Sequence, residues 1–132
     1  MKNCIFCKIA KGKHKSAIIY QNNGFIAFLD AYPVSEGHTL VISRRHYRWV
    51  YDVPNFKEYW QFVLQITKMI QKNLNPQWIQ YFTHGKLPHA HIHIIPRYEP
   101  IERASFMPFE NNQNPASFKD LQNIARLINN NI

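Results

Sequence analysis

Three histidines alternate with Ala and Ile in the stretch 88–96, which reads PHAHIHIIP. A period of two is typical of a β-strand, so we expect a strand here with His89, His91 and His93 on one face. The two prolines that bound the stretch suit strand ends, where no ladder hydrogen bond is donated. Each neutral imidazole carries a donor and an acceptor and titrates near neutral pH, so the cluster indicates a functional site rather than packing alone.

Three kinds of chemistry use histidines spaced in this way. Two histidines on a strand and a third nearby can hold a catalytic zinc ion that keeps a position open for water. A neutral imidazole can also attack an electrophile while its neighbours position groups or move protons. The third use is a binding surface without catalysis, and the spacing alone does not choose among the three.

The elements that must position this stretch predict an α+β fold with an antiparallel sheet of about five strands. Residues 83–87 form a short connection into the histidine strand, and a connection of this length favours an antiparallel hairpin. Turn-prone residues at 22–24 predict a second hairpin. Besides the histidine strand, the apolar and β-branched runs predict strands at 17–20, 25–29, 38–42 and 78–82.

Two helices complete the expected fold. Apolar residues recur at three- and four-residue spacing over 54–73, which predicts one long amphipathic helix, with Asp52 as its cap. A C-terminal helix is predicted over 117–128, where Ser117 and Asp120 approximate a capping box. We find no repeat and no domain boundary, so residues 1–132 are expected to form a single domain.

The composition narrows the class of protein. Aromatic residues make up 14% and apolar residues 45% of the 132 residues, which argues against disorder. No apolar run approaches the ~20 residues of a membrane span, and the first residues lack a signal-peptide pattern, so we expect a cytoplasmic protein without a membrane partner. The formal charge of +8 favours phosphate-bearing ligands, but no motif for specific nucleic-acid binding is present.

The cysteines form one C-x-x-C pair, Cys4 and Cys7. A reducing compartment makes a structural disulfide less favourable than a metal site or free thiols. Tetrahedral zinc needs two further ligands, so the pair alone does not establish a metal site.

Several separate segments together resemble the histidine triad (HIT) family of nucleotide hydrolases and transferases. They are the histidine stretch with Arg97 after it, residues 4–9 (CIFCKI), residues 27–30 (AFLD) and residues 37–42 (GHTLVI) with His46 beyond. The resemblance implies a HIT-like fold, a homodimer, and cleavage at the α-phosphorus of nucleoside phosphoramidates or dinucleoside polyphosphates. The product would be a nucleoside monophosphate, and the base would be adenine or another purine.

The resemblance also implies roles for individual residues. His91 would be the nucleophile that forms a transient nucleotidyl-histidine, and His93 would face the leaving group. His38 would lie against the same site, and His89, the first histidine of the triad, would belong to the catalytic group as well. The nucleoside would lie among Phe6, Ile9, Phe28, Leu29, Asp30 and Ala31, with Asp30 accepting hydrogen bonds from the ribose hydroxyls.

This chain departs from the family pattern before the triad, where the usual phosphate-contacting Gln is absent. Thr83, His84 or Lys86 would then supply the phosphate contacts. Two alternatives therefore stay open beside the hydrolase: a nucleotide-binding or signalling module with little turnover, and a metal-dependent hydrolase that uses the triad as ligands.

A zinc-containing, bacterial-type branch of the family has the same N-terminal cysteine pair. The resemblance places the zinc ligands at Cys4, Cys7, His46 and His89. Such a closed Cys₂His₂ site would be structural, so no cofactor would be required for the chemistry itself.

Overall fold

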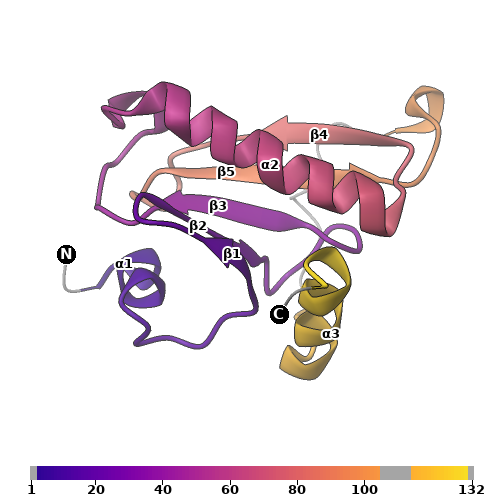
Figure 1. The fold of residues 1–132 in the computed structure, drawn as a ribbon, viewed down its shortest axis with the longest axis horizontal. Coiled ribbons are helices and arrows are strands. Elements are labelled where there is room, and N and C mark those ends of the chain that lie inside the picture. The colour runs from indigo at the N-terminus through magenta and orange to yellow at the C-terminus, as the bar shows by residue number, and fades with distance from the viewer. Residues whose placement is uncertain (1–2, 105–113, 131–132) are drawn as a thin grey trace.

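The computed structural model describes residues 3–104 and 114–130. Its five-stranded antiparallel sheet has the strand order β1-β2-β3-β5-β4. The predicted α+β class is confirmed, and Figure 1 shows α2 lying across one face of the sheet. The strands are β1 (Ile18–Gln21), β2 (Phe25–Leu29), β3 (Thr39–Ser43), β4 (Trp78–Phe82) and β5 (His91–Arg97); the helices are α1 (Ile5–Ala10), α2 (Phe56–Leu74) and α3 (Phe118–Ile128), with 3₁₀ turns at Val50–Asp52 and Ile101–Arg103.

The two faces of the sheet bury different sets of side chains. Alternate residues of β2 divide between them, with Ala27 and Leu29 in the larger core beneath α2 and Ile26 and Phe28 in a smaller core with α1. This division follows from the period of two in a strand. In β5, Ile92 and Ile94 belong to the larger core, so the histidines between them project towards the α1 face.

The long helix α2 supplies most of the larger core. Its buried face includes Tyr59, Val63, Ile66 and Ile70, spaced as the sequence predicts for an amphipathic helix. Asp52 does not cap it, because that residue ends a separate 3₁₀ turn and the position before α2 is taken by Asn55. The helix ends where Asn75 adopts a left-handed conformation with φ of 53°.

The C-terminal helix α3 begins as predicted. The amide of Asp120 donates to Ser117 Oγ at 3.1 Å, which satisfies one of the free N–H groups in the first turn. Its buried residues Leu121, Ala125 and Ile128 join the larger core. The segment before it is tied to the end of β2, because the amide of Ala116 donates to the Ala31 carbonyl at 2.9 Å.

The histidine strand differs from the prediction at both ends. β5 begins at His91 and runs through Pro96 to Arg97, so His89 lies before the strand. Its ring still lies on the α1 side of the sheet, where it contacts Cys4, and the Phe6 ring contacts both His89 and His91. Pro96 is tolerated inside the strand because β3 pairs no further than Ile94. The Pro96 carbonyl accepts from the Ser35 hydroxyl on that side, so the missing N–H removes no ladder hydrogen bond.

The predicted hairpin between β4 and β5 is confirmed, with Phe82 opposite His93. Part of the stretch 98–114 lies outside the described residues. Within residues 3–104 and 114–130, no helix combines the length and apolar character that crossing a membrane requires.

Candidate functional site

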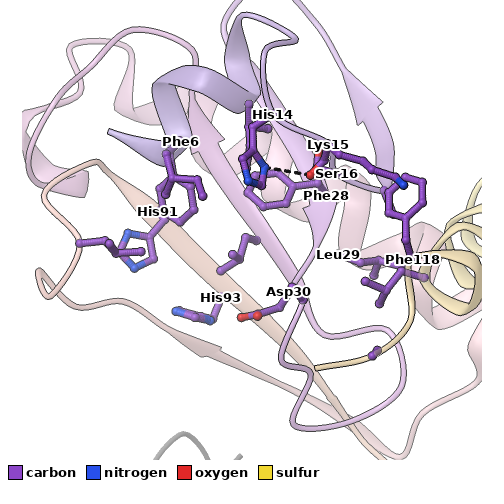
Figure 2. A pocket seen from close by; sticks show the side chains of 18 of the residues that line it. Phe6, His14, Lys15, Ser16, Phe28, Leu29, Asp30, His91, His93 and Phe118 are labelled. Carbon is purple, nitrogen blue, oxygen red and sulfur yellow. Dashed lines mark hydrogen bonds between the residues drawn. The ribbon is translucent and has the colours of Figure 1, made fainter. Parts of the chain in front are cut away.

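A cavity of about 440 Å³ opens on the α1 face of the sheet, beside His91 and His93. Figure 2 shows Phe6 and His91 on one side of it and Lys15 and Phe118 on the other, with His93 and Asp30 between. Apolar side chains from α1, β2, β3 and α3 line much of it. The cavity therefore combines flat apolar walls with a few polar groups, as sites for small organic ligands do.

Most of the nucleotide-binding residues expected from the resemblance line this cavity. These are Phe6, Ile9, Phe28, Leu29, Asp30 and Ala31. Thr83 and Lys86 do not line it, whereas their neighbour His84 does. The Thr83 hydroxyl instead donates to the His91 carbonyl at 2.7 Å.

The expectations did not include the far wall of the cavity, where His14, Lys15, Phe118 and Leu121 lie. The Lys15 ammonium stands 4.1 Å from the centre of the Phe118 ring, within range of a cation–π contact. The segment before α3 reaches the cavity because the amide of Ala116 donates to the Ala31 carbonyl. This contact joins distant parts of the chain, so local sequence patterns did not reveal it.

The hydrogen bonds of His91 fix which of its nitrogens carries the proton. His91 Nδ1 lies 2.7 Å from the His89 carbonyl oxygen. A carbonyl only accepts, so Nδ1 bears the hydrogen and the lone pair of the neutral ring is on Nε2. Burial lowers the pKa of His91 to about 4, so the ring is neutral at pH 7 and Nε2 can act as a nucleophile.

A second chain of hydrogen bonds fixes the proton of His93. The backbone amide of Val34 donates to His38 Nδ1 at 3.0 Å, so the hydrogen of the neutral His38 ring is on Nε2. That Nε2 lies 2.9 Å from His93 Nδ1 and donates to it. In the neutral His93 ring the hydrogen is therefore on Nε2. This ring offers the cavity an N–H donor, where His91 offers a lone pair.

Burial keeps this pair of imidazoles neutral. His38 is 1% and His93 5% exposed. Loss of solvation lowers the pKa of His38 to about 4 and that of His93 to about 2, and repulsion from His38 adds to the effect at His93.

The carboxylate of Asp30 stands at the edge of the same group. Its Oδ1 accepts from the Tyr32 amide at 2.8 Å, and its Oδ2 lies 3.5 Å from His38 Nε2. Burial raises the pKa of Asp30, while the Tyr32 amide opposes that shift. The side chain lines the cavity and has acceptor sites left for hydroxyl donors.

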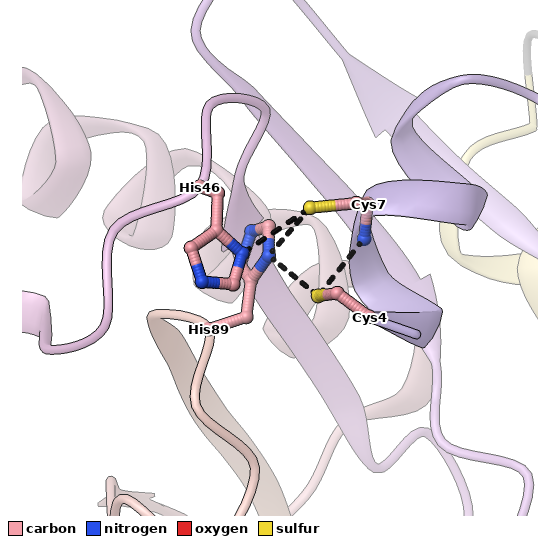
Figure 3. A group of neighbouring side chains, drawn as sticks. All are labelled: Cys4, Cys7, His46 and His89. Carbon is pink, nitrogen blue, oxygen red and sulfur yellow. Dashed lines mark hydrogen bonds between the residues drawn. The ribbon is translucent and has the colours of Figure 1, made fainter. Parts of the chain in front are cut away.

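A second cluster lies where α1 meets the start of the histidine stretch. Figure 3 shows Cys4 and Cys7 facing His46 and His89. His89 Nδ1 lies 3.2 Å from Cys4 Sγ and 3.5 Å from Cys7 Sγ, and His46 Nδ1 lies 3.2 Å from Cys7 Sγ. The four ligand atoms all lie within 4.8 Å of one another.

The donor set and its spacing fit a tetrahedral metal ion. Zn–S bonds of ~2.3 Å and Zn–N bonds of ~2.0–2.1 Å place sulfur and nitrogen about 3.6 Å apart, close to the separations in this cluster. His89 Nε2 is 2.7 Å from the Ser43 carbonyl, so it carries the hydrogen and leaves the Nδ1 lone pair directed at the two sulfurs.

Comparison with known proteins places this geometry in a family. The sequence model of the HIT domain matches residues 11–100. The chain belongs to the HIT family. Among HIT relatives, Protein hit of Bacillus subtilis is 37% identical over 105 residues, covering 74% of this chain and 72% of that protein. The adenosine 5'-monophosphoramidase of Saccharomyces cerevisiae is 31% identical over 100 residues, covering 71% of this chain and 62% of that one.

Solved HIT structures share the whole fold. A Hit-like protein from Bartonella henselae superposes with a TM-score of 0.83 at 27% identity, over 100% of this chain and 98% of that one. A Zn-bound histidine triad family protein from Mycobacterium smegmatis has a TM-score of 0.76 at 25% identity, over 96% and 91% of the two chains.

Proposed function

We propose that this HIT protein is a nucleotide hydrolase that cleaves at the α-phosphorus of nucleoside phosphoramidates or dinucleoside polyphosphates. The observation that carries the proposal is the 2.7 Å contact between His91 Nδ1 and the His89 carbonyl. It leaves the His91 Nε2 lone pair as the nucleophile in a cavity lined by apolar walls and a carboxylate. The names of the yeast relatives, adenosine 5'-monophosphoramidases, agree with this reaction class.

In the first step, His91 Nε2 forms a bond to phosphorus, and the bond from phosphorus to the leaving group breaks. The electron pair stays on the bridging atom, where the N–H of His93 stabilises the developing charge. Water then attacks phosphorus, the bond to His91 breaks, and the lone pair returns to the ring. Over both steps the phosphate gains the hydroxyl of water and the leaving group gains its proton, releasing a nucleoside monophosphate.

The walls of the cavity support a nucleoside as the common part of the substrate. Phe6 and Phe28, with ring centres 5.8 Å apart, provide an apolar surface for a flat base such as adenine or another purine. The Asp30 carboxylate would accept hydrogen bonds from the two ribose hydroxyls.

We propose further that Cys4, Cys7, His46 and His89 hold structural zinc. The sulfur–nitrogen separations of 3.2–3.5 Å support this, as does the Zn-bound relative from Mycobacterium smegmatis. With four protein ligands, zinc would cross-link the N-terminal segment to the sheet and would have no coordination position left for water.

A second candidate is metal-dependent hydrolysis, because the imidazoles of His84, His91 and His93 each place a ring nitrogen within 4.8 Å of the others. The hydrogen bonds favour the covalent route instead, because His93 presents an N–H and His89 turns its lone pair towards the cysteines. A metal on His84, His91 and His93 would require the tautomer of His93 to change, and a metal on the triad would also require His89 to turn from the cysteines.

Hydrolysis of a fluorogenic adenosine phosphoramidate by wild type and His91→Ala, each with and without chelator, tests the proposal. We expect the wild type to release AMP in chelator and the variant to lose at least ~10³-fold in kcat, as for an essential catalytic group. If the protein loses turnover in chelator while it stays folded, a bound metal and not His91 carries the catalysis. Tight nucleotide binding without turnover would make the protein a binding module.

We also infer a homodimer in the cytoplasm. β4 is an edge strand of the sheet, and its Tyr81 is 41% exposed, so the edge is available to a second copy. The reducing cytoplasm suits a pair of cysteines that bind metal as thiolates. Sedimentation velocity that gives a monomer mass at micromolar concentration would contradict the dimer.

A further inference from the structure

His84 brings a third imidazole to the cavity from the connection between β4 and β5. Its ring centre lies 4.8 Å from that of His91, with the planes at 85°, and 5.4 Å from that of His93, with the planes at 29°. The side chain lines the cavity. His84 therefore stands beside both the nucleophile and the N–H donor.

The backbone fixes the proton of His84 as it does for the other two rings. The amide of Lys86 donates to His84 Nδ1 at 3.0 Å. The hydrogen of the neutral ring is consequently on Nε2, at the opposite edge from this bond. Burial lowers the pKa of His84, and the nearby Lys86 ammonium lowers it further, so the neutral form prevails at pH 7.

The connection is anchored on both sides of His84. Before it, the Thr83 hydroxyl donates to the His91 carbonyl. After it, Gly85 packs so closely on the Trp49 ring that an added Cβ would lie 2.1 Å from it. These anchors keep His84 in place without a ligand, which reduces the ordering cost when one binds.

Among the three residues of this connection that could bind phosphate, the contacts favour His84 over Thr83 and Lys86. The Thr83 hydroxyl hydrogen is already donated to His91, and the exposed Lys86 side chain does not line the cavity. His84 is the residue of this connection that joins cavity lining to a defined N–H donor.

We propose that His84 is a phosphate-binding residue of this active site, whose Nε2–H donates to a non-bridging oxygen of the α-phosphate during attack by His91. The inference rests on the proposed hydrolase function. In this arrangement the N–H groups of His84 and His93 both lie beside the nucleophilic lone pair of His91. His84 then performs the task for which the chain lacks the family's Gln.

Two matched variants test this role. His84→Gln keeps an amide N–H at nearly the position of Nε2, and His84→Leu keeps the bulk but removes the donor. We expect His84→Leu to lower kcat for the phosphoramidate by roughly 10²-fold, as for loss of one preorganised donor, and His84→Gln to recover most of it. Thermal melts of both variants verify folding.

Binding of AMP and of adenosine gives a readout that a merely structural role would not change. His84→Leu should weaken AMP by about 10-fold, because a hydrogen bond to a charged group is lost, and leave adenosine unchanged. Equal weakening of both ligands would show that His84 only shapes the cavity and would overturn the inference.

The outcomes for the inference and for the proposed function are distinguishable. If wild type turns over, His91→Ala does not, and His84→Leu matches wild type in kcat and AMP affinity, the role of His84 fails alone. If wild type does not turn over, the hydrolase function fails and the catalytic part of the inference is overturned with it. The comparison of AMP with adenosine then still decides whether His84 binds phosphate.

Discussion

Replacing His38 by Gln should make the stability of the protein less dependent on pH. His38 is 1% exposed, and burial lowers its pKa from 6.5 to about 4. Between these values the unfolded chain binds a proton at this position and the folded chain does not. Stability therefore falls as the pH falls through this window, by up to ~1.4 kcal/mol per pH unit for one group.

The size of the effect follows from the two pKa values. Between pH 7.5 and pH 5, protonation of unfolded His38 should cost wild type about 2 kcal/mol that the Gln variant does not lose. The titratable groups that face His38 include His93 at 2.9 Å and Asp30 at 3.5 Å. His93 shifts in the same direction as His38 and Asp30 in the opposite one, and both remain in the variant.

Urea denaturation of wild type and His38→Gln at several pH values between 5 and 7.5 measures this difference. With a typical m-value of about 1–3 kcal/mol/M, the midpoints of the two proteins should diverge by roughly 1 M at the acidic end. Loss of bound metal at low pH would affect both proteins and cancels in the comparison. Parallel curves of unfolding free energy against pH would refute the assignment of a buried, neutral His38.

Three other substitutions address separate parts of the molecule. Cys7→Ser should lower the zinc content measured by elemental analysis. It should also lower kcat, because the carbonyl that holds His91 Nδ1 belongs to His89, a ligand of the proposed zinc site; full zinc content would argue against that site. Asp30→Asn should raise KM for a ribonucleotide by about 10-fold and reduce the preference for the ribonucleotide over its 2'-deoxy form. An unchanged preference would contradict the contact between Asp30 and the ribose. Tyr59→Phe removes the 2.7 Å bond to the Val41 carbonyl, so chemical denaturation should find ~1–2 kcal/mol lower stability, whereas no change would mean that the carbonyl finds another donor.

Local patterns predicted the sheet and its two long helices well. β2 and β4 begin and end at the predicted residues, because each is a short, mostly apolar run bounded by turn-prone residues. The ends of β5 were wrong, since pairing with β3 sets its start at His91 and pairing with β4 carries it to Arg97, whatever the positions of the prolines. Asp52 was misassigned because a 3₁₀ turn intervenes before α2.

In the candidate site, too, the features set by local sequence were predicted and those set by contacts between distant segments were not. The alternation of His89, His91 and His93 is local, and it predicted three imidazoles on one face; all three rings lie on the α1 side of the sheet. That His89 directs its Nδ1 lone pair at the cysteines depends on the Ser43 carbonyl, 46 residues away in the sequence. The position of Phe118 in the cavity wall likewise depends on a contact between distant segments, so periodicity in the sequence did not reveal it.

Backbone groups, more than the ring itself, decide what each imidazole of the triad can do. A carbonyl at Ser43 makes His89 a lone-pair donor through Nδ1, and the carbonyl of His89 makes His91 one through Nε2. The amide of Val34, acting through His38, makes His93 a proton donor. A graft of the five residues His-Ala-His-Ile-His onto another strand would carry the His89 carbonyl along but would leave Ser43, Val34 and His38 behind. The first and last of its three rings would then interconvert between tautomers in water.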